Sequence, residues 1–361
     1  MTKTVSIELA REGFRRATST EERVYEAGRL IKRAESGDIF ALATLREALS
    51  TSDFPELVGQ GLQTKALQTY KDTPKEFEDI LVNAEPVPDF ERRKVVDLWG
   101  AEEFERVHEG EEYKAAGKKY TELEHGAGKY GRVLKLTWEL FLARRFSDIA
   151  NFPRDLAQGS VKTQNAAVAD LLVKDGAWNG DFFGDVKNVP LNADTLQAAI
   201  QELAVRENHR GELVDVSSLY LVHGPALRYQ VANLLVNLSE LEITDTSGTR
   251  TTKQKVTNPF RNVVKPLESR SVGKRLGTAA GTAWALVQGK DSDLPSILRT
   301  NLAGHADVDI RVQNDQGQSL GGGALSPTDG SFKDDTIAYR GRSAFGIDPG
   351  FTPGVWASKG A

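Results

Sequence analysis

Residues 130–140 read Tyr-Gly-Arg-Val-Leu-Lys-Leu-Thr-Trp-Glu-Leu, and this stretch, with the segment that follows it, decides the fold of the chain. Apolar and polar side chains alternate along it almost without interruption. Because successive side chains of a strand point to opposite faces of a sheet, this period of two predicts a half-buried β-strand.

A long helix is predicted soon after the strand. Asn151 supplies a capping side chain, and Pro153 lies near the first turn, where its missing N–H is not needed. Gly176 is predicted to end the helix, which would run from about residue 153 to 175 and span on the order of 34 Å. We call it the spine helix. Its apolar face consists of Leu156, Val161, Val168, Leu171 and Leu172.

The composition is that of a folded globular protein. The 361 residues include 39% hydrophobic and 27% charged residues, which suits two compact domains or one elongated unit built from several subdomains. A formal net charge of −5 gives no overall attraction to nucleic acid or to an anionic membrane. The lack of cysteine excludes disulfides and thiolate chemistry. With no apolar signal segment and no run of about 18 apolar residues, a soluble cytosolic product is expected.

Residues 1–90 are predicted to form a helical segment followed by an arm. In residues 1–50 we expect two short, charged amphipathic helices, one from Thr20 to Ile31 and one from Asp38 to Leu49. Residues 51–90 contain four prolines and spaced apolar anchors, which is typical of an arm that lies across another surface. These prolines and anchors are Pro55, Pro74, Pro86, Pro88, Phe54, Leu57, Tyr70, Phe77 and Ile80.

Residues 91–138 are predicted to contain two strands separated by a highly charged segment. Residues 95–99 read as one strand and residues 120–123 as its return. Residues 102–119 between them have few apolar anchors and cannot form a core. One interpretation is a solvated helix with mixed-sign pairs such as Glu102 and Arg106. The other is a long hairpin that docks on a neighbouring copy through opposite charges, which implies an oligomer.

A second domain is predicted from about residue 188 to 314. A helix capped by Asn192 or Asp194, a strand at residues 218–222 and a helix starting at Pro225 indicate an α/β or α+β arrangement. We expect further strands around residues 263–264 and 283–287 and a helix at residues 295–302. The glycine-rich residues 315–329 are predicted to be a flexible loop, and residues 336–346 a strand far in sequence from its partners.

The search for catalytic chemistry yields no site. No nucleotide-binding glycine loop, zincin helix or nucleophile elbow occurs in the sequence. His305, Asp307 and Asp309 could share one face of a strand and bind a hard metal ion, although alternating polar residues are also common on a solvated strand face. The other histidines are expected at the surface: His108, His125, His209 and His223. We therefore predict no cofactor and no enzymatic activity.

Two small basic clusters do not form a recognisable nucleic-acid module. Arg11, Arg15 and Arg16 are expected on a solvated helix face. Arg144 and Arg145 lie between the main strand and the spine helix, where we expect them to pair with carboxylates at a contact between subunits.

The order of parts and several local segments resemble the major capsid proteins of tailed double-stranded DNA bacteriophages, a fold shared with encapsulins and the floor of the herpesvirus capsid. The resemblance covers residues 54 to 361 approximately. The segments that carry it are residues 134–156, Leu-Tyr-Leu-Val-His-Gly-Pro at 219–225, Asn-Pro-Phe at 258–260 and Asp-Asp-Thr-Ile-Ala-Tyr-Arg-Gly-Arg at 334–342.

The resemblance implies an α+β fold made of six parts. These are an N-terminal helical segment (1–50), an N-terminal arm (51–90), an extended β-hairpin loop with its flanking strands (91–138), a peripheral domain with the spine helix (139–187), an axial α/β domain (188–314), and a glycine-rich loop with a C-terminal strand that returns to the peripheral domain (315–361). The first fifty residues could be an internal scaffolding segment, removed or retained, or an extension of the arm.

The implied function is structural. Subunits would form hexamers and pentamers of an icosahedral shell around packaged DNA, with scaffold, portal or decoration proteins as further partners and no membrane. The shell would assemble in the host cytoplasm, and its DNA contacts would be loose and non-specific. The residues predicted to make contacts between subunits are Arg106, Glu109, Glu111, Glu112, Lys114, Lys118, Lys119, Arg144 and Arg145. An encapsulin-like nanocompartment and a soluble enzyme of unknown type are the competing hypotheses.

Overall fold

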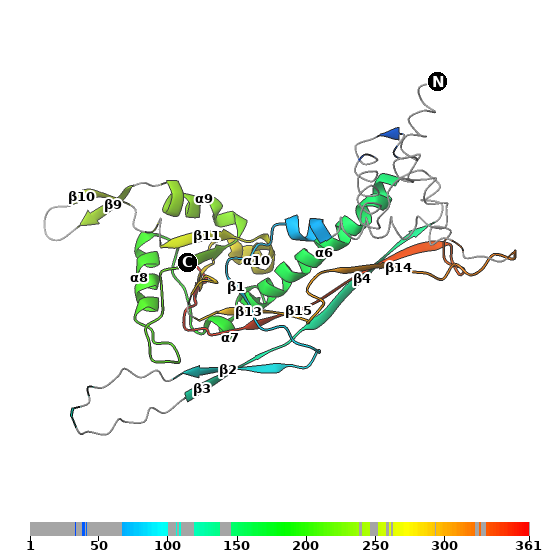
Figure 1. Cartoon of the computed structure of the whole chain (residues 1–361). Coiled ribbons are helices and arrows are strands. Elements are labelled where there is room, and N and C mark those ends of the chain that lie inside the picture. The colour runs from blue at the N-terminus through cyan, green and yellow to red at the C-terminus, as the bar shows by residue number, and fades with distance from the viewer. Residues whose placement is uncertain are drawn as a thin grey trace. The chain divides into compact units, whose positions relative to one another are not determined.

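The computed structural model describes most of the chain from residue 67 onward. The described residues are 67–99, 119–137, 146–237, 240–245, 252–257, 263–292, 294–321 and 330–360, with Arg33, Asp38, Ile39, Ala41, Arg106, His108, Glu109, Phe260 and Leu325. Helices and strands are mixed along the chain (Figure 1), and the predicted α+β class is confirmed.

The chain forms two compact units. Unit 1 comprises Met1–Pro74, Lys129–Thr163 and Gly304–Ala344, and unit 2 comprises Lys75–Gly128, Gln164–Ala303 and Phe345–Ala361. Two elements contribute residues to both units, the helix α6 (Phe146–Leu172) and the strand β15 (Thr336–Pro349).

Unit 1 contains a sheet in which β14 (Asp309–Val312) and β4 (Gly128–Thr137) both pair with β15. The antiparallel register of β14 and β15 places Ile310 opposite Gly341. The first half of α6 packs on this sheet, since a Cβ on Gly341 would lie 3.1 Å from Leu156 Cδ2. The small core of the unit consists of Tyr70, Ala157, Val161 and Val308.

Unit 2 contains a mixed sheet with the strand order β11-β8-β12-β16-β7. Its strands are β11 (Val264–Glu268), β8 (Leu219–His223), β12 (Trp284–Gln288), β16 (Trp356–Ser358) and β7 (Val186–Lys187). A further ladder pairs β1 (Leu81–Asn83) in parallel with β13 (Ile297–Asn301), which pairs antiparallel with the end of β15. The remaining strands form three two-stranded ladders, β2 (Arg93–Trp99) with β3 (Lys119–His125), β5 (Val173–Lys174) with β6 (Ala177–Trp178), and β9 (Glu240–Asp245) with β10 (Thr252–Thr257).

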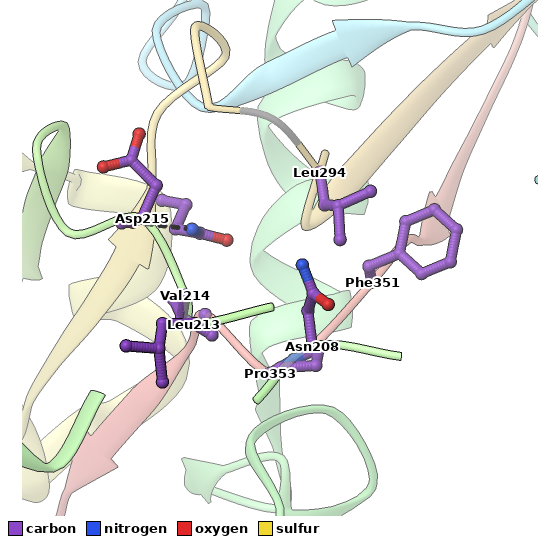
Figure 2. Close-up of a pocket in the computed structure, with 9 residues that line it drawn as sticks. Asn208, Leu213, Val214, Asp215, Leu294, Phe351 and Pro353 are labelled. Atoms are coloured by element: carbon purple, nitrogen blue, oxygen red, sulfur yellow. Dashed lines mark hydrogen bonds between the residues drawn. The ribbon is translucent and has the colours of Figure 1, made fainter. Parts of the chain in front are cut away.

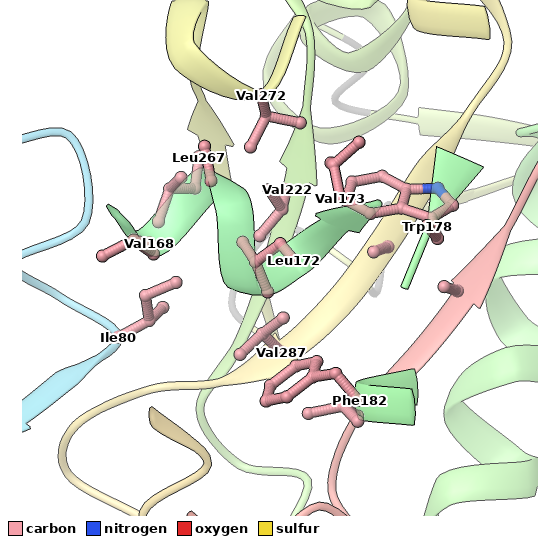
Figure 3. Packing of buried hydrophobic residues seen from close by; sticks show 14 of the residues in the cluster. Ile80, Val168, Leu172, Val173, Trp178, Phe182, Val222, Leu267, Val272 and Val287 are labelled. Carbon is pink, nitrogen blue, oxygen red and sulfur yellow. The ribbon is translucent and has the colours of Figure 1, made fainter. Parts of the chain in front are cut away.

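Helices cover both faces of the mixed sheet of unit 2. They are the α-helices α7 (Gly180–Phe183), α8 (Ala193–Ala204), α9 (Arg228–Val231) and α10 (Arg270–Leu276), the 3-10 helices η1 (Pro225–Leu227) and η4 (Gly277–Gly281), and the π-helix η2 (Ala232–Asn237). Alternate residues of β8 enter two different cores, because Tyr220 and Val222 pack with the end of α6 and with α10 (Figure 3), whereas Leu219 and Leu221 pack with α8 and α9.

The spine helix exists, but its predicted start is wrong. α6 begins at Phe146, so Asn151 and Pro153 lie inside the helix and not at its N-terminus. A proline removes one i→i−4 hydrogen bond, which is why the sequence favoured a start there. The preceding Ser147 and Asp148 are good first-turn residues, however, and no glycine or second proline separates them from Pro153. The helix therefore extends upstream through the proline.

The helix also ends earlier than predicted. α6 stops at Leu172, and Gly176 instead belongs to a tight turn between β5 and β6 with Asp175, both at positive φ (78° and 53°). Asn179 then caps the helix, since its N–H donates to Leu172 O at 2.9 Å and its Nδ2 to Leu171 O at 2.9 Å. The predicted apolar face is confirmed, with Leu171 only partly buried.

The helix predicted at residues 295–302 is wrong, because this segment is the strand β13. Ile297, Leu298, Arg299 and Thr300 are all buried, since β13 lies between β1 and β15. A strand buried on both faces has no alternation, so periodicity alone could not distinguish it from a buried helix.

The other elements of residues 188–314 are confirmed. Asn192 caps α8 by accepting from Thr195 N–H at 2.8 Å, and the Thr195 side chain completes a capping box. The strand at residues 218–222, the helical segment from Pro225 and the strands near residues 264 and 284 correspond to β8, η1 with α9, β11 and β12. The predicted C-terminal strand is β15, which is longer than expected, and β16 was not predicted.

The predictions for residues 1–123 are tested in part. The strands at residues 95–99 and 120–123 are confirmed as β2 and β3. Of the arm's anchors, Tyr70, Phe77 and Ile80 are buried within the chain itself, whereas Phe54 and Leu57 lie outside the described residues. Asp38 accepts from Ala41 N–H at 3.3 Å, as expected of the cap of the second short helix. The first short helix lies outside the described residues.

Candidate assembly surfaces

The ladder of β2 and β3 is the first candidate surface. The register runs from Arg93 opposite His125 to Trp99 opposite Lys119. Lys94 Nζ and Glu122 Oε2 form an exposed ion pair at 2.5 Å, and Val96 is 48% exposed. No third strand among the described residues pairs with this ladder. Because an isolated two-stranded ladder is marginally stable in water, such a ladder favours a partner surface.

The root of this ladder is fixed to unit 2 by a buried carboxylate. Asp348 on β15 has a side chain that is only 9% exposed. Arg92 Nη2 donates to its Oδ1 at 2.7 Å, and Gly126 N–H donates to its Oδ2 at 3.1 Å. His125 lies beside it, with Nδ1 2.8 Å from Thr300 Oγ1. Charge-assisted bonds of this kind are among the stronger polar contacts, so they hold the base of the ladder in one position.

A glycine on β15, Gly346, allows the base of the ladder to approach this strand closely. A Cβ on Gly346 would lie 1.7 Å from Gly126 O, which no side chain can tolerate. The ladder can therefore be anchored here only with glycine at this position of β15.

The structure describes three of the predicted contact residues. Arg106 and Glu109 are exposed, and Lys119 is the first residue of β3. The others lie outside the described residues: Glu111, Glu112, Lys114, Lys118, Arg144 and Arg145. The assignment of these residues to contacts between subunits stays a prediction.

The sheet of unit 1 carries a second candidate surface that the sequence analysis did not identify. Arg311 Nε lies 3.0 Å from Asp309 Oδ2, and Arg342 Nη2 lies 2.7 Å from the same oxygen. Arg340 is directly opposite Arg311 across the ladder. Burial raises the pKa of Asp309, but the hydrogen bond from Arg311 and the charges of the three arginines outweigh this effect and lower the pKa overall. We call Arg311, Arg340 and Arg342 the arginine cluster.

The strand β4, which pairs with β15 in the same sheet, is more exposed than predicted. The predicted strand is confirmed as β4, but it is less buried than expected in the single chain: Tyr130 is 39% and Val133 is 51% exposed, and Leu134 is partly buried. Among the described elements β4 pairs only with β15, which leaves it as an edge. Exposed apolar residues on an edge strand are typical of a surface that another chain can cover.

The strand face on which His305, Asp307 and Asp309 could have bound a metal ion does not form. His305 and Asp307 precede β14 in a loop, and the Asp309 carboxylate is occupied by Arg311 and Arg342. No group of three metal-ligating side chains was found within the part of the chain that the structure describes.

Two of the histidines expected at the surface are buried. His125 is 3% exposed and His223 is 2% exposed, because both lie on strands that pack against the core of unit 2. Burial lowers the pKa of His223, and the hydrogen bond to Gly224 O opposes this only in part. Both residues therefore serve packing, whereas His108 is exposed as predicted and His209 is partly buried.

A shallow pocket in unit 2 offers no catalytic constellation. Among the residues that line it (Figure 2), Asp215 is the one ionisable side chain, and its carboxylate accepts from Ser217 N–H at 2.8 Å and Ser217 Oγ at 2.9 Å. Gln288 Nε2 donates to Asp215 O at 2.8 Å. The lining residues are Asn208, Leu213, Val214, Asp215, Gln288, Leu294, Phe351, Pro353 and Gly354. Within the described residues, no helix is long and apolar enough to cross a membrane.

The anchored two-stranded ladder, the exposed edge strand and the arginine cluster are surfaces that another protein chain could cover. A family model described as phage capsid protein matches residues 121–357, about two thirds of the chain. The chain therefore belongs to the phage capsid protein family. It is a structural major capsid protein of a phage, located in the virion capsid, and the nanocompartment and enzyme hypotheses are not favoured.

Similar solved structures come from other phages and are distant in sequence. The mature capsid of bacteriophage PhiM1 has 13% identity and a TM-score of 0.47, with 80% of this chain and 88% of that chain covered. A chain of Mycobacterium phage Bobi has 14% identity and a TM-score of 0.46, with 80% and 92% covered. A chain of Mycobacterium phage Adephagia has 13% identity and a TM-score of 0.44, with 81% and 92% covered. The comparison with curated proteins gives no match.

Proposed function

We propose that this capsid subunit forms hexamers and pentamers that close an icosahedral shell around packaged double-stranded DNA. The match of the phage capsid family over residues 121–357 carries the proposal. A single chain that makes heterologous contacts can form rings of five and six copies, and such rings can close into a shell.

The parts of the chain take different roles in this proposal. Residues 139–187 belong to a peripheral domain stiffened by α6, and residues 188–314 form an axial domain that gathers at the ring centres. Residues 91–138 form the extended loop, which reaches a neighbouring copy. The observation in this chain that supports the last role is the β2–β3 ladder. It is fixed at its base by Arg92 and Asp348 and has no further strand partner among the described residues.

The proposal includes contacts of the loop with the neighbour through its charged residues. Arg106 and Glu109 are exposed and can form ion pairs with another copy. The remaining proposed contacts are Glu111, Glu112, Lys114, Lys118, Lys119, Arg144 and Arg145. Arginine is the most suitable of these cations for a buried pair, because its planar guanidinium can bind a carboxylate with two parallel hydrogen bonds.

We further propose that the shell assembles in the host cytoplasm and has no enzymatic activity of its own. Its contacts with the packaged DNA would be loose, because a chain with a net charge of −5 has little overall attraction to phosphate. Scaffold, portal or decoration proteins are the further partners in this proposal.

Assembly can be tested on the full chain by sedimentation velocity and negative-stain electron microscopy. We expect closed particles, or rings of five and six subunits, in equilibrium with free subunits. A chain that stays monomeric or dimeric under all salt, pH and crowding conditions would contradict the proposal. Particles filled with host enzymes and lacking DNA would point to a nanocompartment.

A deletion can test the role of the extended loop separately. Removing residues 105–118 leaves both β2 and β3 intact, so the subunit should fold but form no closed particles. If the deleted protein unfolds, the segment is part of the core and does not act as a projecting loop. A matched insertion of a Gly/Ser linker of the same length distinguishes loss of the charged sequence from loss of length.

A further inference from the structure

The arginine cluster places like charges next to each other, and their repulsion destabilises the free subunit. Arg311 and Arg340 lie directly opposite each other on β14 and β15, and like charges at such a position destabilise a ladder. Asp309 is the carboxylate that faces the cluster, so three arginines share one acidic group. Within the described residues the side chain of Arg340 makes no hydrogen bond or ion pair. A surplus of two positive charges therefore remains.

The cluster lies on the face of the sheet opposite α6. Ile310 and Gly341 face the helix, as the contact between Gly341 and Leu156 shows. Because side chains alternate along a strand, Arg311, Arg340 and Arg342 lie on the other face. Arg311 is 61% exposed and Arg340 is also exposed, so an anionic group can reach both of them.

The chain itself contains a segment of matching charge. Residues 102–112, between β2 and β3, contain six glutamates and one arginine, for a local net charge of −5. Glu109 in this segment is exposed. Carboxylates can accept paired hydrogen bonds from each guanidinium, which would remove the repulsion within the cluster.

Nucleic acid is the less suitable occupant. Binding to a phosphate backbone generally requires a stripe of several cations, and its strength rises with the number of phosphates neutralised. Here the three arginines and Asp309 leave a surplus of two charges, which could neutralise only about two phosphates. An acidic protein segment of limited length fits a surplus of two charges better.

We propose that the arginine cluster of one copy is the docking surface for the acidic residues 102–112 of a second copy. The inference rests on the proposed function, in which the extended loop reaches a neighbour, and adds the surface that receives it. In this arrangement the repulsion between Arg311 and Arg340 persists in the free subunit. The carboxylates of the second copy compensate it only after assembly.

The charge reversal Arg340→Glu separates folding from assembly. Glutamate at this position would face Arg311 across the ladder, so the thermal stability of the free subunit should stay unchanged or rise. Association with a second copy should weaken by at least about tenfold, because the substitution cancels the surplus of two positive charges and with it the attraction to the acidic segment. Arg270→Glu is the matched control, since Arg270 is also exposed and lies on α10 of unit 2.

Mixing two variants tests whether the contact joins different copies. The second variant carries Glu109→Lys, Glu111→Lys and Glu112→Lys. Each variant alone should associate weakly. An equimolar mixture should form mixed oligomers in native mass spectrometry, since the unchanged acidic segment of the Arg340→Glu variant can dock on the unchanged arginine cluster of the other variant. A mixture that stays as dissociated as the separate variants would overturn the proposal.

A peptide of residues 101–113 provides a readout that does not depend on shell formation. By fluorescence anisotropy, the full-length subunit should bind this peptide at low salt, with at least about tenfold weaker binding by the Arg340→Glu variant and unchanged binding by Arg270→Glu. Equal binding by all three proteins would overturn the inference even if the wild type forms shells. Shells of Arg340→Glu that assemble normally but retain less DNA would also overturn it and identify nucleic acid as the occupant.

Discussion

Arg92 and Asp348 are 256 positions apart in the sequence, yet Arg92 Nη2 lies 2.7 Å from Asp348 Oδ1. The pair joins the first strand of the extended loop to the last long strand of the chain. Since Asp348 also accepts from Gly126 N–H, a single carboxylate holds both strands of the loop at their base.

Replacing Asp348 with alanine should loosen this base. The guanidinium of Arg92 and the N–H of Gly126 would lose their acceptor, and the expected destabilisation is about 1–3 kcal/mol. Chemical denaturation measures the effect on the free energy of unfolding. The yield of assembled particles should fall by more than the loss in the free energy of unfolding explains, because the extended loop would no longer be held in one orientation.

An exposed ion pair serves as the control for Asp348. Asp181 pairs with Lys174, but its side chain is 80% exposed. Asp181→Ala should leave unfolding and assembly almost unchanged, because solvent screens such pairs. If Asp348→Ala behaves like Asp181→Ala, the Arg92–Asp348 pair does not anchor the loop.

Gly346→Ala should disrupt the same region through sterics alone. The added Cβ would lie 1.7 Å from Gly126 O, so β15 and the base of the loop must separate. We expect a loss of about 1–3 kcal/mol in the free energy of unfolding. Gly159→Ala in α6 provides the opposite case, because nothing lies within 4 Å of the added Cβ and a helical alanine is favoured by up to about 1 kcal/mol. Equal effects of the two substitutions would show that Gly126 and Gly346 are not in close contact.

His223 should make stability depend on pH near neutrality. Burial lowers its pKa in the folded state below the ordinary 6.5, so the unfolded state binds the proton more readily. The stabilising contribution is therefore complete above about pH 6.5 and is lost as the pH falls from there toward the folded pKa, with a slope of at most about 1.4 kcal/mol per pH unit. Denaturation at intervals from pH 7.5 to 5 measures this slope, and His223→Asn should reduce it.

Glu202 provides the control for that measurement. Burial raises its pKa, but hydrogen bonds from Trp356 and Arg206 outweigh this effect, and the pKa stays below the ordinary 4.5. Its contribution is lost only as the pH falls below about 4.5, so Glu202→Gln should leave the slope between pH 7.5 and 5 unchanged. A slope that is the same in the wild type and His223→Asn would exclude His223 as its source.

The sequence predicted local features better than long-range ones. The alternation in residues 95–99 and 120–123 identified β2 and β3, and Asn192 identified the start of α8, because these signals depend on neighbouring residues. The Arg92–Asp348 pair and the arginine cluster were missed, since their members come from strands far apart in sequence. Arg340 and Arg342 appeared only within a segment that resembled capsid proteins.

The boundary errors also have physical causes. Pro153 normally favours the start of a helix, yet α6 continues upstream through it. Ile297 to Thr300 are buried on both faces, so their pattern did not show the period of a strand. In both cases the packing of distant segments determined an outcome that local propensity left open.

Val168→Asp should prevent folding and therefore assembly. Val168 is fully buried in α6, in the core that also contains Ile80, Leu172 and Val222 (Figure 3), and a buried unpaired carboxylate costs several kcal/mol. Circular dichroism and soluble yield measure the loss. Lys162→Asp introduces the same side chain at an exposed position of the same helix and should leave the subunit folded. Soluble particles assembled from Val168→Asp would contradict the burial of this face, whereas failure of both variants would show that α6 cannot accept an added aspartate at either position.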